Sequence, residues 1–179
     1  MSKRRFPWKK LFRYGIPLIL TILWICFIFG NSLRNGEESG NQSHAVWEWL
    51  NGIWQWIGFR RPLSEGFVRK LAHFGEFAVL AWLYILDWVA FGKITQGSPR
   101  RASLGWIFSS VPVCFLIAGV DEFLQRFSAG RAAQLSDMLL DTAGALTAAL
   151  ICALLLWIRK RRDKKKLHYY NYEGNRRRS

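Results

Sequence analysis

The sequence predicts an all-α integral membrane protein, a bundle of four transmembrane helices with an amphipathic helix at the extracytoplasmic interface. Three observations predict this class. Four apolar runs approach or exceed the ~20 residues that a helix needs to cross a bilayer. Hydrophobic residues make up 51% of the chain, and ten are Trp, which favours the lipid headgroup region. The net charge of +14 is concentrated at the two ends of the chain, so we expect contact with lipid and no nucleic acid.

The four predicted spans form one domain, residues 14–158. A basic arm, residues 1–13, precedes them, as in a signal peptide. No small-residue cleavage site follows the first apolar run, so we expect that run to be retained as a helix. The spans are predicted at about residues 14–30, 67–91, 104–125 and 137–158.

Basic residues predict the orientation of these spans. Most Lys and Arg lie in the N-terminal arm, in the loop at 92–103 and in the tail at 159–179, and four spans place all three on one side. The positive-inside rule makes that side the cytoplasm, so both termini are expected there. The tail is expected to lack regular structure, with its RKRRDKKK run against anionic lipid of the inner leaflet.

Residues 31–66 then face outward and contain more than a loop. An Asn-, Ser- and Gly-rich stretch, 31–43, is expected to be irregular, and an amphipathic helix is predicted at about 44–59. Its Trp-rich composition suits the outer interface, where indole rings prefer to lie. Two roles remain open, an interfacial anchor or a lid over a site. The apolar residues at helical spacing are Val46, Trp49, Leu50, Ile53, Trp56 and Ile57.

Polar residues gather where three of the spans reach the outer side. Arg69, His73 and Glu76 share one face of the second span, since helical residues advance about 100° each. Lys70 is expected to point away, toward headgroups. Asp121 and Gln125 are four residues apart at the end of the third span, with Glu122 beside them, and Asp137 and Asp141 are four apart at the start of the fourth.

Each of these residues has an ordinary structural explanation. Carboxylates favour helix starts, and Ser136 before Asp137 resembles a helix cap. Glu76 and Asp141 fit that explanation least, because they lie one to two turns inside an apolar run. An ionisable group there costs ~2–3 kcal/mol or more unless it is partnered. We therefore predict a site at the outer leaflet, with Arg69, His73 and Arg131 as the expected partners.

Several motifs, in a fixed order, carry a family resemblance. They are 38-ESGNQS-43, 69-RKLAHFGEF-77, 121-DEFLQ-125, Arg131 and 137-DMLLDTAG-144. Over about residues 14–158 the chain resembles the VanZ-like family of small bacterial membrane proteins. The resemblance implies a bacterial plasma-membrane protein and a link with resistance to lipoglycopeptides such as teicoplanin. It implies no defined reaction, and the Trp-rich segment and the basic tail lie outside the pattern.

The first functional hypothesis is a site for a membrane lipid or a lipid-linked, anionic envelope precursor. Arg69 and Arg131 would hold a phosphate or carboxylate, and His73 would transfer protons. Asp137 and Asp141 would act as a general base or bind a divalent metal. An enzyme of this kind would be a hydrolase or a transferase. Its catalytic candidates are His73, Glu76, Asp121, Asp137 and Asp141, and its substrate-binding candidates are Arg69, Glu122, Gln125, Arg131, Ser39 and Ser43.

The alternative hypothesis is non-enzymatic. The same groups would then form a network that packs the helices together, in a protein that binds or masks an envelope component or is a subunit of a larger complex. The sequence contains no nucleophile motif and no Gly-rich phosphate loop. A transporter is disfavoured, since the polar residues do not continue to the cytoplasmic halves of the spans, where Asp87 stands almost alone.

Overall fold

The structure, a computed structural model, describes the backbone of residues 8–34, 36–96, 103–128 and 134–176. Side chains are described over residues 15–34, 44–91, 103–128 and 134–166. The described backbone contains helices and no strand, which confirms the all-α class. The helices are α1 (Trp8–Ser32), α2 (Gly36–Trp56), α3 (Glu65–Gln96), α4 (Leu104–Gln125) and α5 (Leu135–Arg176).

Four of the described helices are long and apolar enough to cross a membrane. Three of their candidate spans agree with the predicted runs within two residues at each end, and the fourth extends to Lys166, eight residues beyond the predicted end at 158. The protein is therefore a multi-pass membrane protein in its architecture. The spans are Gly15–Ser32 in α1, Glu65–Phe91 in α3, Leu104–Gln125 in α4 and Leu135–Lys166 in α5.

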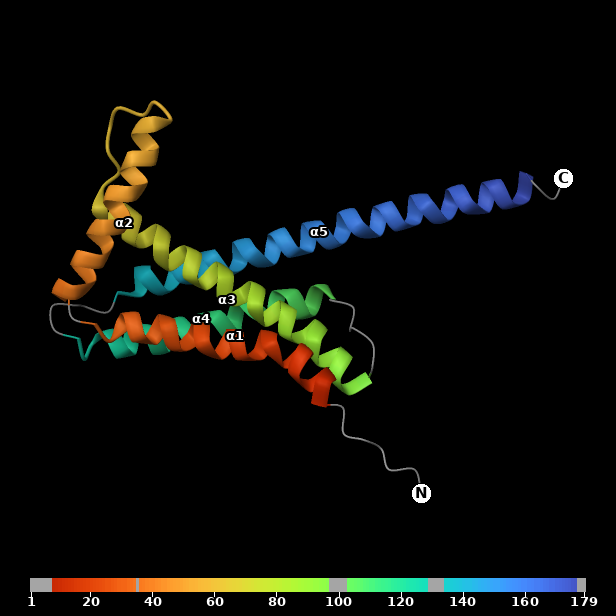
Figure 1. The fold of residues 1–179 in the computed structure, drawn as a ribbon, viewed down its shortest axis with the longest axis horizontal. Helices are drawn as coiled ribbons and strands as arrows, with labels where there is room; N and C mark the ends of the chain where they lie inside the picture. Colours follow the sequence, from red (N-terminus) through yellow and green to blue (C-terminus); the bar gives the residue numbers. More distant parts are fainter. Residues whose placement is uncertain (1–7, 35, 97–102, 129–133, 177–179) are drawn as a thin grey trace, which may run out of the picture.

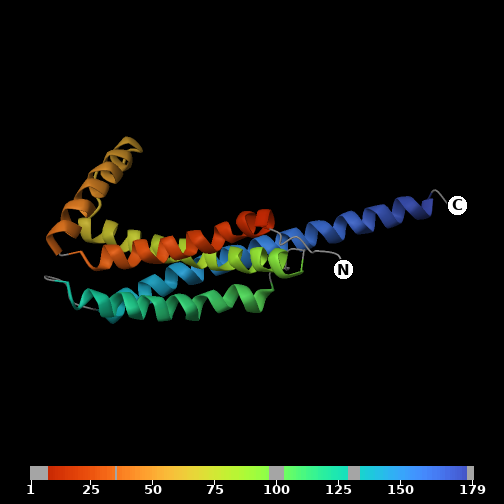
Figure 2. The same cartoon turned by 60° about the horizontal axis from the view of Figure 1, so that its bottom comes forward.

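The four spanning helices run alongside one another, and α3 packs against α1, α4 and α5 (Figures 1 and 2). Two features leave this bundle. Helix α2 crosses one end of it at a steep angle, and α5 continues far beyond the opposite end (Figure 1). We call the end near α2 the polar end. It holds the end of α1, the start of α3, the end of α4 and the start of α5.

Small residues let the helices of the bundle approach closely. Gly144 faces the backbone carbonyl of Phe74, where a Cβ would overlap that carbonyl. Large apolar side chains point outward instead, among them Leu23, Leu116 and Leu155, as expected for a surface in contact with lipid. The main core is formed by Ile28, Phe77, Leu80, Ala81, Cys114, Ala118, Ala145 and Ala148.

Helix α2 begins earlier than predicted and is hydrogen-bonded to the chain that follows it. The stretch expected to be irregular is helical from Gly36 onward. The indole N–H groups of Trp47 and Trp54 donate to the carbonyls of Leu63 (2.6 Å) and Arg61 (3.1 Å). The Asn51 side chain accepts from the Leu63 N–H at 2.7 Å. These bonds tie the helix to the linker before α3, so Trp47 and Trp54, which lie outside the apolar spacing predicted for this helix, have a local role.

The basic tail differs from the prediction. It was expected to lack regular structure, yet α5 continues without a break to Arg176. Lys and Arg are good helix formers, and extending an existing helix avoids the cost of nucleation. Arg161 also lies 3.8 Å from the Trp157 ring centre, a cation–π contact one turn apart.

Candidate functional site

Polar side chains from three spanning helices meet at the polar end, inside the bundle. Asp121, Glu122 and Gln125 occupy the last turns of α4, and Asp141 lies in the second turn of α5. All four are buried, Asp121 at 0% and Asp141 at 1% relative exposure. Burial this deep is costly for a carboxylate, so it indicates that these residues do more than cap a helix.

One trio stands out within this group. His73 of α3, Asp121 of α4 and Asp141 of α5 each offer a ligand atom, and these three atoms lie within 4.8 Å of one another. All three residues were candidates from the sequence, but Asp141 was paired there with Asp137. The structure places Asp137 one turn closer to the helix start and partly exposed. We call His73, Asp121 and Asp141 the buried trio, after the two buried aspartates; the His73 side chain is partly exposed.

Neighbouring residues orient the members of the trio. Gln125 donates its Nε2–H to Asp121 Oδ2 at 3.0 Å. His73 Nδ1 lies 3.9 Å from Glu76 Oε2. On the α1 side, Asn31 Nδ2 donates to Glu76 Oε1 at 3.4 Å. The sequence analysis did not single out Asn31, although it is the first polar residue after the first apolar run.

Close helix packing places the trio. Gly144 lies one turn after Asp141, and Phe74 directly follows His73. The absence of a side chain at Gly144 lets α5 reach the Phe74 carbonyl. This contact brings the two helices together beside the histidine and the aspartate.

Glu122, a substrate-binding candidate from the sequence, makes a contact with the chain before α5. Its Oε2 accepts the Gln134 backbone N–H at 2.9 Å. Ser128 similarly donates its hydroxyl to the Ser32 carbonyl at 2.9 Å, joining the chain after α4 to the end of α1. These bonds connect the loops of the polar end. Glu122 also borders a second cleft, of about 270 Å³, with Gly119, Phe123, Arg126, Gln134, Leu135 and Met138.

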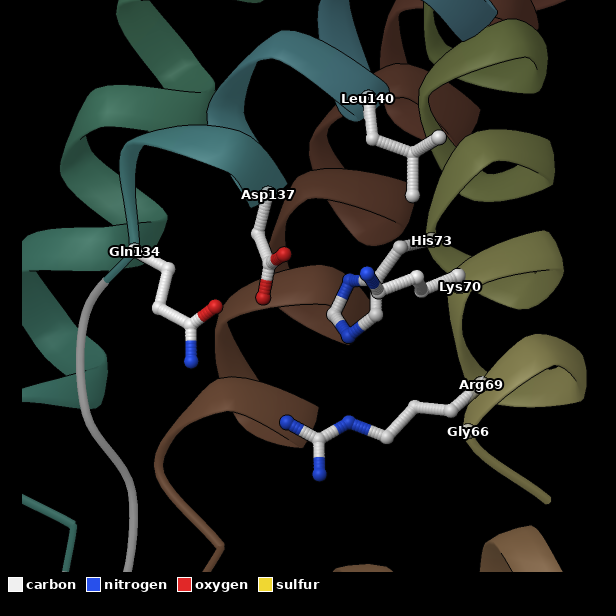
Figure 3. Close-up of a pocket in the computed structure, with 7 residues that line it drawn as sticks. All are labelled: Gly66, Arg69, Lys70, His73, Gln134, Asp137 and Leu140. Carbon is white, nitrogen blue, oxygen red and sulfur yellow. The ribbon is translucent and has the colours of Figure 1, made fainter.

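An open cleft lies beside the buried trio, between the starts of α3 and α5 (Figure 3). Its volume is about 160 Å³. The Arg69 guanidinium, the His73 ring and the Asp137 carboxylate point into the same space (Figure 3). Lys70 was expected to point away, yet it lines the cleft as well. The complete lining is Gly66, Arg69, Lys70, His73, Gln134, Asp137 and Leu140.

His73 therefore belongs to both features, the cleft and the buried trio. The cleft presents Arg69 and Lys70 to an incoming group, a pairing suited to an anion. The trio beneath presents two carboxylates and an imidazole, a set suited to a cation or to proton transfer. Side by side, they form a site with a basic rim and an acidic floor.

Three candidates fall outside what the structure describes in detail. Ser39 and Ser43 lie within the backbone of α2, but their side chains are outside the described residues. Arg131 lies outside the described residues altogether. The structure therefore assigns these three no contacts.

Comparison with known proteins gives one match. Residues 17–156 match the family model described as VanZ/LLP1. This range includes two complete candidate spans and most of the other two, and it contains the cleft and the buried trio. No curated protein and no solved structure matches the chain.

Proposed function

We propose that this chain, which belongs to the VanZ/LLP1 family, binds the anionic headgroup of a lipid or lipid-linked envelope precursor in the cleft between α3 and α5. The observation that carries the proposal is the convergence of Arg69, Lys70 and His73 on one open space (Figure 3). Three nitrogen-bearing side chains at a helix start, where the backbone dipole also favours negative charge, suit a phosphate or carboxylate.

The place of the cleft supports a lipid as the source of the anion. It opens at the ends of two helices that are long enough to cross a membrane. The ends of such helices lie at the depth of the lipid headgroups. A polar ligand could enter there while its acyl chains stay beside the apolar outer surface of the bundle. Exposed Phe67 and Leu71 lie on α3 close to the cleft residues and extend that apolar surface.

The charge distribution supports an outward-facing site in a bacterial plasma membrane. The basic extension of α5, including Arg159 to Lys166, leaves the bundle at the end opposite the cleft (Figure 1). The positive-inside rule places that extension in the cytoplasm, against anionic lipid of the inner leaflet. The cleft then faces the outer leaflet, and α2 lies along the outer interface as an anchor.

His73 is the group suited to proton transfer, since its side chain is 20% exposed at the cleft and faces Glu76. A hydrolase or transferase acting on the bound headgroup would use it in that role. Sequestering or altering an envelope precursor would change its availability to teicoplanin-like antibiotics, so resistance to them is the expected cellular consequence.

The test compares two arginine variants. Arg69→Ala removes a cleft residue, and Arg60→Ala removes the same charge from the exposed linker between α2 and α3, outside the cleft. Each protein is purified in mild detergent and titrated with phosphatidylcholine vesicles, with and without phosphatidic acid as a phosphomonoester probe. Inorganic phosphate as a competitor separates recognition of a lipid from recognition of the free anion. Co-purifying lipids are identified by mass spectrometry.

We expect wild type and Arg60→Ala to bind the phosphatidic acid vesicles alike. Arg69→Ala should bind about tenfold more weakly or worse, because a charge-assisted hydrogen-bonded pair contributes ~1.5–3 kcal/mol. Its unfolding temperature should stay unchanged, because Arg69 is exposed. Equal binding by all three proteins would refute the proposal. A fall in unfolding temperature with unchanged lipid binding would favour the helix-packing network instead.

A further inference from the structure

The buried trio supports an inference that does not depend on the proposed lipid. We propose that His73, Asp121 and Asp141 bind a divalent transition-metal ion, such as Zn²⁺ or Mn²⁺, at the floor of the cleft. Their ligand atoms already lie within 4.8 Å of one another. Bonds of about 2.0–2.2 Å in a tetrahedral site require ligand separations near ~3.4 Å. Small side-chain rotations would close that difference.

Asp141 provides an independent reason to expect a cation. It is 1% exposed, and its Oδ1 is buried with no hydrogen-bond partner among the residues that the structure describes. The Asp141 carboxylate is also one of the three groups that face one another in the trio. A buried carboxylate oxygen without a hydrogen bond is costly unless a cation or proton satisfies it.

The surroundings of Asp141 increase the electrostatic cost of burying its carboxylate. The carboxylates of Asp121, Glu122, Asp137 and Glu76 all lie close enough to act on it electrostatically. Each additional negative charge in a setting of low dielectric raises the free energy of the others. A dication bound by the trio would offset this repulsion at its centre.

The supporting contacts resemble those around known kinds of metal site. Metal-bound histidines commonly present their second nitrogen to a carboxylate, which orients the ring. His73 Nδ1 lies 3.9 Å from Glu76 Oε2, so the proposal assigns Nε2 to the metal. A metal-bound His73 would act as a ligand and would not serve as the proton-transfer group. Metal-bound carboxylates are likewise held by hydrogen bonds, as Gln125 holds Asp121 Oδ2 at 3.0 Å.

The ligand set indicates the class of ion. Ca²⁺ takes six to eight oxygen ligands, and Mg²⁺ prefers an octahedron of oxygens. One imidazole with two carboxylates suits Zn²⁺ or Mn²⁺ better. Three protein ligands leave at least one position open, and His73 connects the trio to the cleft, so that position would face an incoming ligand or a water.

The test is a metal titration without lipid. Wild type, Asp141→Asn and Asp87→Asn are purified without affinity tags, stripped of metal and titrated with Zn²⁺ and with Mn²⁺ by calorimetry. Asp87 is the control, because it is another aspartate of a spanning helix, although only partly buried, and it lies outside the trio in the half of α3 away from His73. Co²⁺ then replaces Zn²⁺, since its visible absorption reports mixed nitrogen and oxygen ligands.

We expect wild type and Asp87→Asn to share a site of one Zn²⁺ per chain that Asp141→Asn binds at least about 100-fold more weakly, since even losing a supporting contact costs 10–100-fold. Unfolding of the metal-free proteins checks that Asp141→Asn is folded. His73→Ala should lose the Co²⁺ band that wild type shows.

Two results would overturn the proposal: a wild type that binds neither Zn²⁺ nor Mn²⁺ in this titration, or an Asp141→Asn that binds Zn²⁺ as wild type does. Arg69→Ala separates this proposal from the lipid site. It should keep the metal and lose phosphatidic acid, so either proposal can fail while the other stands.

Discussion

The two halves of the bundle bury carboxylates in different ways. In the half away from the cleft, Asp87 Oδ2 accepts a hydrogen bond from Thr21 of α1 at 2.8 Å. No other charged group acts strongly on Asp87 among the described residues. At the polar end, four other carboxylates act electrostatically on Asp141. Oδ1 of Asp87 and Oδ1 of Asp141 both lack a hydrogen-bond partner within the described part of the chain, so the two aspartates differ in their charged neighbours. A lone carboxyl bonded to a hydroxyl links two helices, whereas a group from three helices gathers negative charge around a common centre.

The halves also differ in how their helices are held together. Away from the cleft, Trp106 of α4 stacks on Trp88 (3.9 Å between ring centres) and Tyr84 (4.9 Å) of α3. At the polar end, the contact between Gly144 and the Phe74 carbonyl replaces such side-chain packing. Aromatic packing stabilises one half, and close backbone approach makes room for polar groups in the other.

The largest effect is expected from Gly144→Ala. A methyl group there would overlap the Phe74 carbonyl, so α3 and α5 must separate beside the buried trio. We expect a loss of about 3 kcal/mol, the upper part of the usual range for overpacking, and loss of metal and lipid binding together. Thermal unfolding in detergent measures the stability.

Gly75→Ala is the matched control for that variant, because a Cβ at Gly75 meets nothing within 4 Å. It should unfold within about 0.5 kcal/mol of wild type or be slightly more stable, since Ala favours helix. If Gly144→Ala lost little stability, the close contact would not be what holds the polar end together.

The next effect has the opposite sign. Asp141→Asn should raise the stability of the metal-free protein by about 1–2 kcal/mol, because it replaces an ionisable group buried among carboxylates with a neutral amide. Asp87→Asn should change the stability less, since Thr21 can still donate to the amide oxygen. Unfolding in the presence of a chelator measures both. A less stable Asp141→Asn would show that the aspartate is a structural link like Asp87.

Thr21→Val should cost about 1 kcal/mol, since interhelical hydrogen bonds in membranes contribute ~0.6 kcal/mol on average and up to ~1.7 kcal/mol. The substitution removes the hydrogen bond that the Asp87 carboxylate accepts from Thr21 of α1. Zn²⁺ and lipid binding should be unchanged, because the substitution lies outside the polar end. Loss of metal binding in this variant would show that the two halves are coupled.

Ser128→Ala should have the smallest effect, about 0.5 kcal/mol, because its bond to the Ser32 carbonyl joins two neutral groups. It tests how far the polar end depends on hydrogen bonds between neutral groups. Hydrogen exchange over the last turns of α1 and α4 would detect the loosening. A loss of Zn²⁺ affinity would mean that this bond helps to place Asp121.

The candidate site was partly predictable. Three- and four-residue spacings placed Arg69, His73 and Glu76 on one face, and they placed Asp121 with Gln125, a pair that the structure joins by a hydrogen bond. The same rule paired Asp141 with Asp137, and there it was insufficient. Two residues on one helical face differ in depth by a full turn, and only the neighbouring helix decides which of them is buried.

The four spans follow from the length of the apolar runs, because a bilayer leaves few alternatives to helices of about that length. The helical tail follows from no such constraint, since a solvated basic segment is helical or disordered with little difference in free energy. The position of Asn31 beside Glu76, the approach of Gly144 to Phe74 and the meeting of His73, Asp121 and Asp141 depend on how separate helices pack. Helical periodicity describes one helix at a time, so contacts between helices appear only when the bundle is assembled.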